Sequence, residues 1–318
     1  MLNRFFLVLL LLFMSCGNGS DEDRFAIGFL DAVEDSTLAL AREGFTDALK
    51  DGGWSEDEGN LRIIFRNAQG DMSTLVQSMQ HFTSNRVDLI AANSTLSTIT
   101  AVQRSGDIPV CMMVAPEPDQ AGLSSSPTDF PPNLFGVFET LSYIDTSLIY
   151  IKEWMPDVQT IGLIYNQAET QSLNALERVK SVAAQTGLEV HALPVTNSSE
   201  TQLVANSLVS RGIDVFFALP DNIIFSSFEV IRRVCNEAGV PIFTSEAGLV
   251  ARGAVAAYGA DFYEWGYQAG EQAVEFLDSG GAILPIPKSV KLRRKVYNTE
   301  AAAKFGLETI DGFEPLEL

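Results

Sequence analysis

The sequence has few of the residues that most enzymes and metal sites require. It contains only 2 histidines and 3 cysteines in 318 residues. His81 falls in a predicted helix and His191 in a predicted strand, and neither has a cysteine or carboxylate partner at the spacing of a metal site. No GxSxG, P-loop or HExxH motif occurs in the chain. We therefore expect a protein that is not an enzyme and that has no catalytic residues, metal ions or cofactors.

Positive charge is also scarce. The chain has 21 lysine and arginine residues against 41 aspartate and glutamate residues, which gives a formal net charge of −20. A protein that binds nucleic acid needs a basic surface to meet the phosphates, so this balance argues against a nucleic-acid partner. Beyond residue 24, no apolar run approaches the roughly 20 residues of a membrane-spanning helix. We expect the mature protein to touch a membrane only through a lipid anchor.

Residues 1–15 have the pattern of a signal peptide. Arg4 precedes a short apolar core, residues 5–13, which has the length of a signal sequence rather than of a membrane span. The segment FMSC, which ends at Cys16, resembles the lipobox of bacterial lipoproteins and implies that Cys16 is acylated. An ordinary secretory peptide with a chance cysteine is the alternative. Residues 16–24 are polar and suit a tether between a lipid anchor and an extracytoplasmic domain.

Strands and helices alternate along the rest of the chain, which predicts an α/β fold with parallel sheets. Apolar runs bounded by turn residues predict buried strands, and apolar residues three and four apart predict helices. The first set has expected strands at 25–33, 61–68 and 109–114, expected helices at 37–50 and 71–84, and a strand followed by a helix within 87–100. The second set has expected strands at 160–165, 189–195, 214–219 and 241–244, and expected helices at 170–186, 200–211 and 223–238.

This repetition predicts two Rossmann-like lobes joined by a hinge. A proline-rich excursion at 115–142, which contains an alternating apolar segment at 134–140, is expected to cross between the lobes. Cys111 and Cys235 fall in different lobes, so we expect both to be buried free thiols. The remaining expected segments are 254–258, a helix at 262–278, a strand at 289–292 and a helix at 299–305. The resulting boundaries are 25–138 plus 253–282 for the N-lobe and 139–252 plus 283–318 for the C-lobe.

Polar residues follow the carboxyl ends of the predicted strands in both lobes. This edge of an open parallel sheet is where ligands bind, and a helix that starts there favours an anion. Within 87–100, an apolar strand leads into Ser94 and Thr95, and we expect this turn to hold the carboxylate of a small molecule. Turn and helix-cap roles are the alternative for all of these residues. The other strand ends carry Glu34 to Ser36, Glu117, Asn166 to Ser172, Asp221-Asn222 and Ser245-Glu246.

Six stretches in register resemble the extracytoplasmic substrate-binding proteins of ABC transporters, in the branch whose characterised members bind aromatic amino acids. They are VEDSTLALAREGF (33–45), NAQGD (67–71), IPVCMMVAPEPDQAGL (108–123), IGLIYNQAETQS (161–172), PDNIIFSSFE (220–229) and GAVAAYGADFYEWGYQAGE (253–271). The resemblance implies a type I periplasmic-binding fold with a small-molecule ligand, an amino acid, between the lobes. It also implies an ABC permease as partner and a monomeric protein. A sensory subunit that binds the same ligand is the alternative.

The resemblance also implies which residues bind the ligand. An acid at Asp221, Glu169 or Glu246 would pair with an ammonium group, while the Ser94 turn would take the carboxylate. The first loop departs from the family pattern Glu-His-Pro-Ala-Leu-Asp, because Asp35 and Ser36 stand in it, and we expect a different side-chain pocket there. The matching positions are Ser94 and Thr95 for a hydroxyl turn, Asp221-Asn222 for a Thr-Asp-Asn turn, Glu169 and Ser172 for a Glu-x-x-Ser loop, and Glu246 for an Asp.

Overall fold

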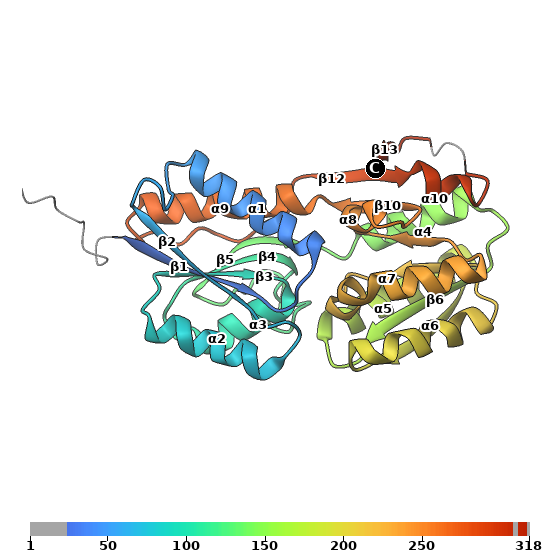
Figure 1. Ribbon diagram of the computed structural model, residues 1–318, viewed down its shortest axis with the longest axis horizontal. Coiled ribbons are helices and arrows are strands. Elements are labelled where there is room, and N and C mark those ends of the chain that lie inside the picture. Colours follow the sequence, from blue (N-terminus) through green and yellow to red (C-terminus); the bar gives the residue numbers. More distant parts are fainter. Residues whose placement is uncertain (1–23, 308–310, 317–318) are drawn as a thin grey trace, which may run out of the picture.

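The computed structural model describes residues 24–307 and 311–316, and it consists of two α/β lobes that lie side by side (Figure 1). Each lobe is built on a mostly parallel sheet with helices on both faces, so the predicted fold class is confirmed. The predicted signal peptide and the lipid-anchor residue Cys16 lie outside the described residues. Within the described ranges, no helix combines the length and apolarity needed to cross a membrane.

The first sheet has the strand order β11-β5-β4-β3-β1-β2, and all of its neighbouring strands run parallel. Helices α1 and α9 cover one face of this sheet, and α2 and α3 cover the other (Figure 1). The strands are β1 Phe25–Asp31, β2 Leu61–Asn67, β3 Leu89–Asn93, β4 Val110–Pro116, β5 Leu134–Glu139 and β11 Lys288–Ser289. The helices are α1 Ser36–Asp51, α2 Met72–Ser84, α3 Thr95–Arg104 and α9 Phe262–Asp278.

The second sheet has the order β13-β12-β10-β9-β8-β6-β7, and its neighbours are parallel except for the antiparallel pair β10 and β12. Its strands are β6 Thr160–Asn166, β7 Glu189–Val195, β8 Val215–Ala218, β9 Ile242–Thr244, β10 Ala256–Ala260, β12 Arg293–Asn298 and β13 Glu314–Leu316. Its helices are α4 Tyr143–Trp154, α5 Thr170–Thr186, α6 Thr201–Ser210, α7 Asn222–Ala238, α8 Ala247–Ala251 and α10 Thr299–Ala303, with a 3₁₀ turn at Ser198–Glu200.

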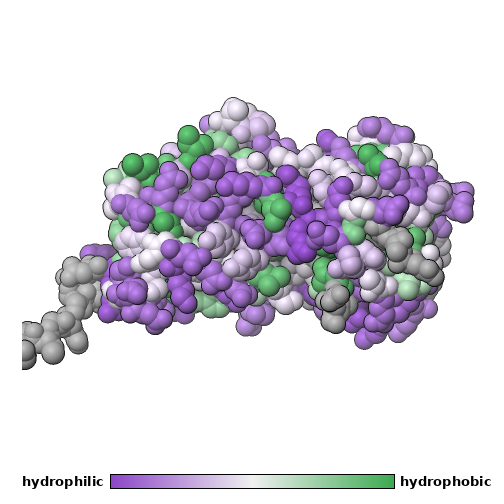
Figure 2. Space-filling view, turned by 90° about the horizontal axis from the view of Figure 1, so that it is seen from above, coloured by the Kyte–Doolittle hydropathy of each residue, from purple (hydrophilic) through white to green (hydrophobic). Residues whose placement is uncertain are grey.

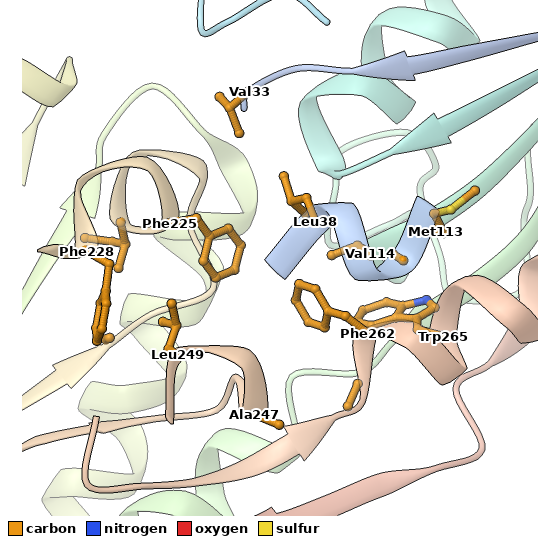
Figure 3. Close-up of a cluster of buried hydrophobic side chains, with 14 of the residues drawn as sticks. Val33, Leu38, Met113, Val114, Phe225, Phe228, Ala247, Leu249, Phe262 and Trp265 are labelled. Atoms are coloured by element: carbon orange, nitrogen blue, oxygen red, sulfur yellow. The ribbon is translucent and has the colours of Figure 1, made fainter. Parts of the chain in front are cut away.

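The apolar core is continuous across the two lobes on one side of the molecule. One buried cluster joins residues of α1 and α9 in the first lobe with residues of α6, α7 and α8 in the second. Figure 3 shows the part of it that α1, α7, α8 and α9 form. Two separate clusters fill the opposite faces, one under α2 and α3 and one under α4 and α5. Cys111 and Cys235 are buried free cysteines, as predicted, and burial raises the pKa of the Cys235 thiol to about 12.

Helices α1 and α9 pack backbone against backbone at two glycines. A Cβ atom on Gly44 would lie 2.0 Å from the Tyr263 carbonyl oxygen, and one on Gly266 would lie 1.8 Å from the Ala41 carbonyl oxygen. Such distances are far below van der Waals contact, so a side chain at either position would push the helices apart. This close packing fixes α9 on the first lobe, although its residues follow a strand of the second.

The chain crosses between the sheets three times, which confirms the arrangement expected for a hinge. The crossings lie between β5 and α4, between β10 and α9, and between β11 and β12. The expected lobe boundaries need correction at two places. Strand β10 extends the second sheet by pairing with β9 and so does not belong with the N-lobe segment 253–282, whereas β11 pairs with β5 in the first sheet and so does not belong with the C-lobe segment 283–318.

Two predicted segments differ from the structure, and two helices were not predicted. The apolar segment at 134–140 is not itself a crossing, because β5 forms there as a buried strand beside β4. The strand expected at 289–292 is also wrong, since β11 ends at Ser289 and the next strand begins at Arg293. Helix α4 and the short helix α8 were not predicted, and both follow directly after residues that line the site described next.

Candidate functional site

A cavity lies between the two lobes, at the carboxyl ends of their parallel strands. It encloses about 470 Å³ of space free of protein atoms, including its opening to solvent. First-lobe strand ends, second-lobe strand ends and the start of α9 all contribute to its wall. The lining residues are Ser94, Thr95, Val114, Ala115, Pro116, Glu139, Leu141, Tyr143, Gln171, Pro220, Asn222, Phe225, Glu246, Phe262 and Trp265.

The predicted hydroxyl turn at Ser94 and Thr95 lies in this wall and is almost fully buried. Ser94 precedes α3 but its side chain makes no cap hydrogen bond, and its Oγ lies 3.4 Å from Ser97 Oγ. The backbone of Ser94 is left-handed, with φ of 90°, as is that of Val114 in the neighbouring strand, with φ of 51°. Strained backbone of this kind concentrates at ligand sites. The hydroxyl and the free N–H groups at the start of α3 are therefore available to an anion.

Glu246 is the unpaired acid of the cavity wall. It is 4% exposed, its Oε2 has no hydrogen-bond partner, and its Oε1 lies 3.5 Å from Ser245 Oγ. It precedes α8 without capping that helix through its side chain. Burial, together with the charges of Glu139 and Asp35, raises the pKa of Glu246 well above its usual range. The unpartnered oxygen of a buried carboxyl needs a hydrogen-bond donor. A cationic donor would also balance the negative charge of the ionised carboxylate.

The second acid of the wall, Glu139 at the end of β5, already has a partner. Arg293 from the start of β12 donates to it through Nε at 2.9 Å and Nη2 at 2.5 Å. This pair neutralises Glu139 and joins two of the crossing segments. Tyr143 lies beside both acids, and burial and the charge of Glu246 raise the pKa of its hydroxyl well above the usual range. Glu246 is thus the acid of this wall that is left for a ligand.

Glu169 lies behind the wall and binds two of the residues that form it. Its carboxylate accepts hydrogen bonds from the side-chain amides of Gln171 and Asn222, and from Asn166 Nδ2 at 2.8 Å. Burial, reinforced by the nearby Asp221 carboxyl, raises the pKa of Glu169 from 4.5 to about 7. Glu169 itself is not among the residues that line the cavity, and its role as a direct partner of an ammonium group stays a prediction.

Asp221 and Ser172 also lie behind the wall. Asp221 caps α7: its Oδ1 accepts from the backbone N–H groups of Ile223 at 2.8 Å and Ile224 at 3.3 Å, and its Oδ2 accepts from that of Asn166 at 3.1 Å. Ser172 Oγ accepts from the same Asn166 N–H at 2.9 Å. Because the carboxylate is already used by backbone donors, the structure gives Asp221 a capping role, which was the alternative weighed for it.

The first loop, with Asp35 and Ser36, does not line the cavity. Asp35 caps α1 through Oδ1, which accepts from the Thr37 and Leu38 N–H groups at 2.8 and 3.1 Å. Its Oδ2 accepts from Arg252 Nη1 at 2.6 Å, an ion pair that links the first lobe to the second. Ser36 is exposed at the start of α1. This loop therefore contributes to the contact between the lobes, and its part in a side-chain pocket stays a prediction.

Aromatic residues that the sequence did not single out complete the cavity. Phe225 of α7 and Phe262 of α9 come from different lobes and pack edge to face with ring centroids 6.0 Å apart (Figure 3). Phe262 packs in the same way on Trp265, at 5.7 Å, and the Trp265 indole N–H donates to the Val137 carbonyl oxygen at 2.8 Å. The wall thus combines apolar rings with a few polar groups, and no metal-binding cluster occurs among the described residues.

Comparison with known proteins identifies the family to which the chain belongs. Residues 26–312 match the family model described as ABC transporter substrate binding protein. A tyrosine-binding protein from Clostridioides difficile is 38% identical over 261 residues, which cover 82% of this chain and 74% of that protein.

Solved structures agree on the fold. A conserved domain protein from Vibrio cholerae superposes with a TM-score of 0.84 at 26% identity, covering 92% of this chain and 99% of that one. An ABC domain in complex with L-Trp from Streptococcus pneumoniae gives 0.84 at 24% identity, with 92% and 100% coverage. A ligand-free, open substrate-binding protein with adhesive properties from Clostridium difficile gives 0.67 at 30% identity, with 92% and 99% coverage. The chain belongs to the ABC transporter substrate-binding proteins, which are solute-binding proteins and not enzymes.

Proposed function

We propose that this protein binds an aromatic amino acid as a zwitterion between its lobes and delivers it to an ABC permease in the membrane. The observation that carries the proposal is the composition of the cavity. An unpartnered buried carboxyl, Glu246, lies on the second-lobe side, and the Ser94 turn at the start of α3 lies on the first-lobe side. The first suits an ammonium group and the second a carboxylate. The aromatic wall suits a flat apolar side chain.

The relatives support the same ligand class. One is a tyrosine-binding protein and another was solved with L-Trp. The family further supports an extracytoplasmic location, and we propose that Cys16 is acylated and anchors a monomeric protein to the outer side of a bacterial membrane. Metabolic labelling with a fatty acid tests the anchor, because the Cys16→Ala variant should then carry no label.

The proposed ligand is tested by thermal shift and calorimetry on the purified protein with L-Tyr, L-Trp, L-Phe and L-Leu. A ligand at a hundredfold excess over its Kd should stabilise the protein by about 2.7 kcal/mol. Tyramine, which lacks the carboxylate, and 3-(4-hydroxyphenyl)propionate, which lacks the ammonium group, should each bind far more weakly than L-Tyr. If no amino acid raises the melting temperature, the proposed ligand class is wrong.

A further inference from the structure

Gln171 carries a second unpartnered acceptor in the cavity wall. It is the second residue of α5, is 4% exposed, and its Oε1 has no hydrogen-bond partner. Its Nε2, in contrast, donates to a carboxylate oxygen of Glu169. A buried carbonyl oxygen without a donor costs free energy, so such groups in folded proteins mark the place of a missing partner.

Glu169 determines which end of the Gln171 amide is free. In its ionised form, above its pKa of about 7, Glu169 can only accept hydrogen bonds, so the amide nitrogen of Gln171 points to Glu169 and its carbonyl oxygen points elsewhere. The same holds for Asn222, whose Nδ2 donates to Glu169 at 3.1 Å. With the Asn166 amide as a third donor, the carboxylate holds the surrounding side chains in one orientation. This side of the cavity therefore offers an acceptor and no free amide donor from Gln171.

The position of Gln171 separates it from Glu246. Glu246 follows β9 and Gln171 follows β6, and β8 lies between these strands in the sheet. Neighbouring strands are about 4.8 Å apart, so the two residues start from backbone positions roughly 10 Å apart. Helix α7, which follows β8, contributes Phe225 to the cavity wall. A ligand ammonium at Glu246 thus leaves Gln171 Oε1 for a donor at the far end of the ligand.

We propose that Gln171, positioned by Glu169, accepts a hydrogen bond from an N–H or O–H group on the side chain of the ligand. This contact selects aromatic amino acids with a ring donor, such as tyrosine and tryptophan, over phenylalanine. The inference rests on the proposed function, because it takes the ligand to be an amino acid whose ammonium group meets Glu246. It adds a specificity-determining residue, Gln171, and a positioning residue, Glu169.

Calorimetric Kd values for L-Tyr, L-Trp and L-Phe test the proposal with three variants. The wild-type protein should bind at least one ring-donor ligand about 10- to 100-fold more tightly than L-Phe, since an unsatisfied buried acceptor carries a penalty of that size. Gln171→Leu should abolish most of this preference by weakening the ring-donor ligand while leaving L-Phe unchanged or tighter. Gln185→Leu makes the same change on the exposed side of α5 and should retain the wild-type preference. Glu169→Gln should reduce the preference without weakening L-Phe, which a general loss of structure could not do.

Two outcomes would overturn the proposal. One is a Gln171→Leu protein that loses affinity for all three ligands equally, and the other is a wild-type protein that binds L-Phe as tightly as L-Tyr and L-Trp. A second arm needs no variant: on the wild-type protein, 4-fluorophenylalanine should bind as weakly as L-Phe, and 1-methyltryptophan more weakly than L-Trp. Failure of the proposed function is distinct from these outcomes, because the wild-type protein would then bind no amino acid at all.

Discussion

At the scale of single residues, we predict that Glu246 couples ligand binding to protonation. Its carboxyl is buried beside Ser245, Tyr143, Glu139 and Asp35, and burial together with the negative charges raises its pKa well above the usual range. A ligand ammonium at its unpartnered oxygen stabilises the charged form and so lowers that pKa. Binding should therefore release a proton, and affinity should rise with pH until Glu246 is ionised before the ligand arrives.

Calorimetry at pH 6 and pH 8, in buffers of different ionisation enthalpy, measures this proton release directly. Glu246→Gln removes the charge, so we expect it to bind at least about tenfold more weakly and to lose the buffer dependence. Glu275→Gln makes the same change at an exposed position of α9 and should behave as the wild type. A Glu246→Gln protein with unchanged affinity and pH dependence would remove Glu246 from the ligand site.

The candidate site shows how far residues can be placed from sequence alone. Ser94, Thr95, Asn222 and Glu246 line the cavity because a parallel strand delivers its last residues to the carboxyl edge of the sheet. Asp221 stands at such an edge as well, yet its oxygens turn back to the N–H groups of α7. The position of a residue in the sequence predicts that it lies at the carboxyl edge of the sheet. The direction of its side chain depends on which backbone donors compete for it.

The aromatic residues of the candidate site could not be predicted from the sequence, for a different reason. Phe225, Phe262 and Trp265 lie in amphipathic helices whose apolar residues form one stripe, and most of such a stripe packs against its own sheet. Only the contact between α7 and α9 across the two lobes turns part of it toward the cavity. No periodicity along the chain distinguishes these rings from ordinary core residues.

At the scale of elements, the short helix α8 connects the ligand site to the contact between the lobes. Glu246 stands at its start and Arg252 at its end. Arg252 is held within its own lobe by Glu229, to which Nε and Nη2 donate at 2.9 and 2.7 Å, and by the Phe225 carbonyl oxygen at 2.9 Å. Its Nη1 is thereby directed at Asp35 of the first lobe. A shift of α8 on ligand binding would move both ends together.

We predict that Asp35→Asn weakens lobe closure while keeping the cap of α1, because asparagine caps helices as well as aspartate does. Loss of a partly buried ion pair should raise the Kd of the ligand roughly tenfold. It should also increase the radius of gyration in solution scattering. Asp145→Asn is the matched control, since it breaks an exposed ion pair with Arg178 inside one lobe. Equal scattering curves and affinities for Asp35→Asn and wild type would contradict a role of this pair in closure.

Regular elements were predicted well where an apolar pattern marks them, and β12 shows where this fails. Its sequence begins Arg293-Arg294-Lys295, a pattern that is typical of a surface loop. The strand forms by antiparallel pairing with β10, and its cations find acidic partners: Arg293 pairs with Glu139, and Arg294 contacts Asp261 at 3.3 Å. These partners are far away in the sequence, so no local pattern could reveal them.

At the scale of the whole molecule, the acidic residues on the surface and those in the interior are in different environments. Figure 2 shows a mostly hydrophilic face with scattered apolar residues, as a net charge of −20 requires. Inside, several acids are buried or half-buried near the site or at strand ends, among them the buried Asp31, Glu139 and Glu246 and the half-buried Glu169. Burial is the first cause that raises the pKa of each of them. The pKa of Glu169 is about 7 and that of Glu246 lies well above the usual range, so the folded state holds protons on these two groups that the unfolded chain would release at neutral pH.

This proton balance predicts that the protein without ligand is more stable at pH 6 than at pH 8. The pKa of Asp31 is raised from 3.8 to about 6 and that of Glu169 from 4.5 to about 7, so both groups bind protons more tightly in the folded state. Their contribution to stability is complete below the unfolded values and is lost as the pH rises through 6 and 7. Repulsion among the excess acids acts in the same direction. Melting temperatures across this range, with Glu169→Gln as a variant whose profile should be flatter, provide the measurement. A melting temperature that rises from pH 6 to pH 8 would show that the buried acids are stabilised in their charged form by the groups around them.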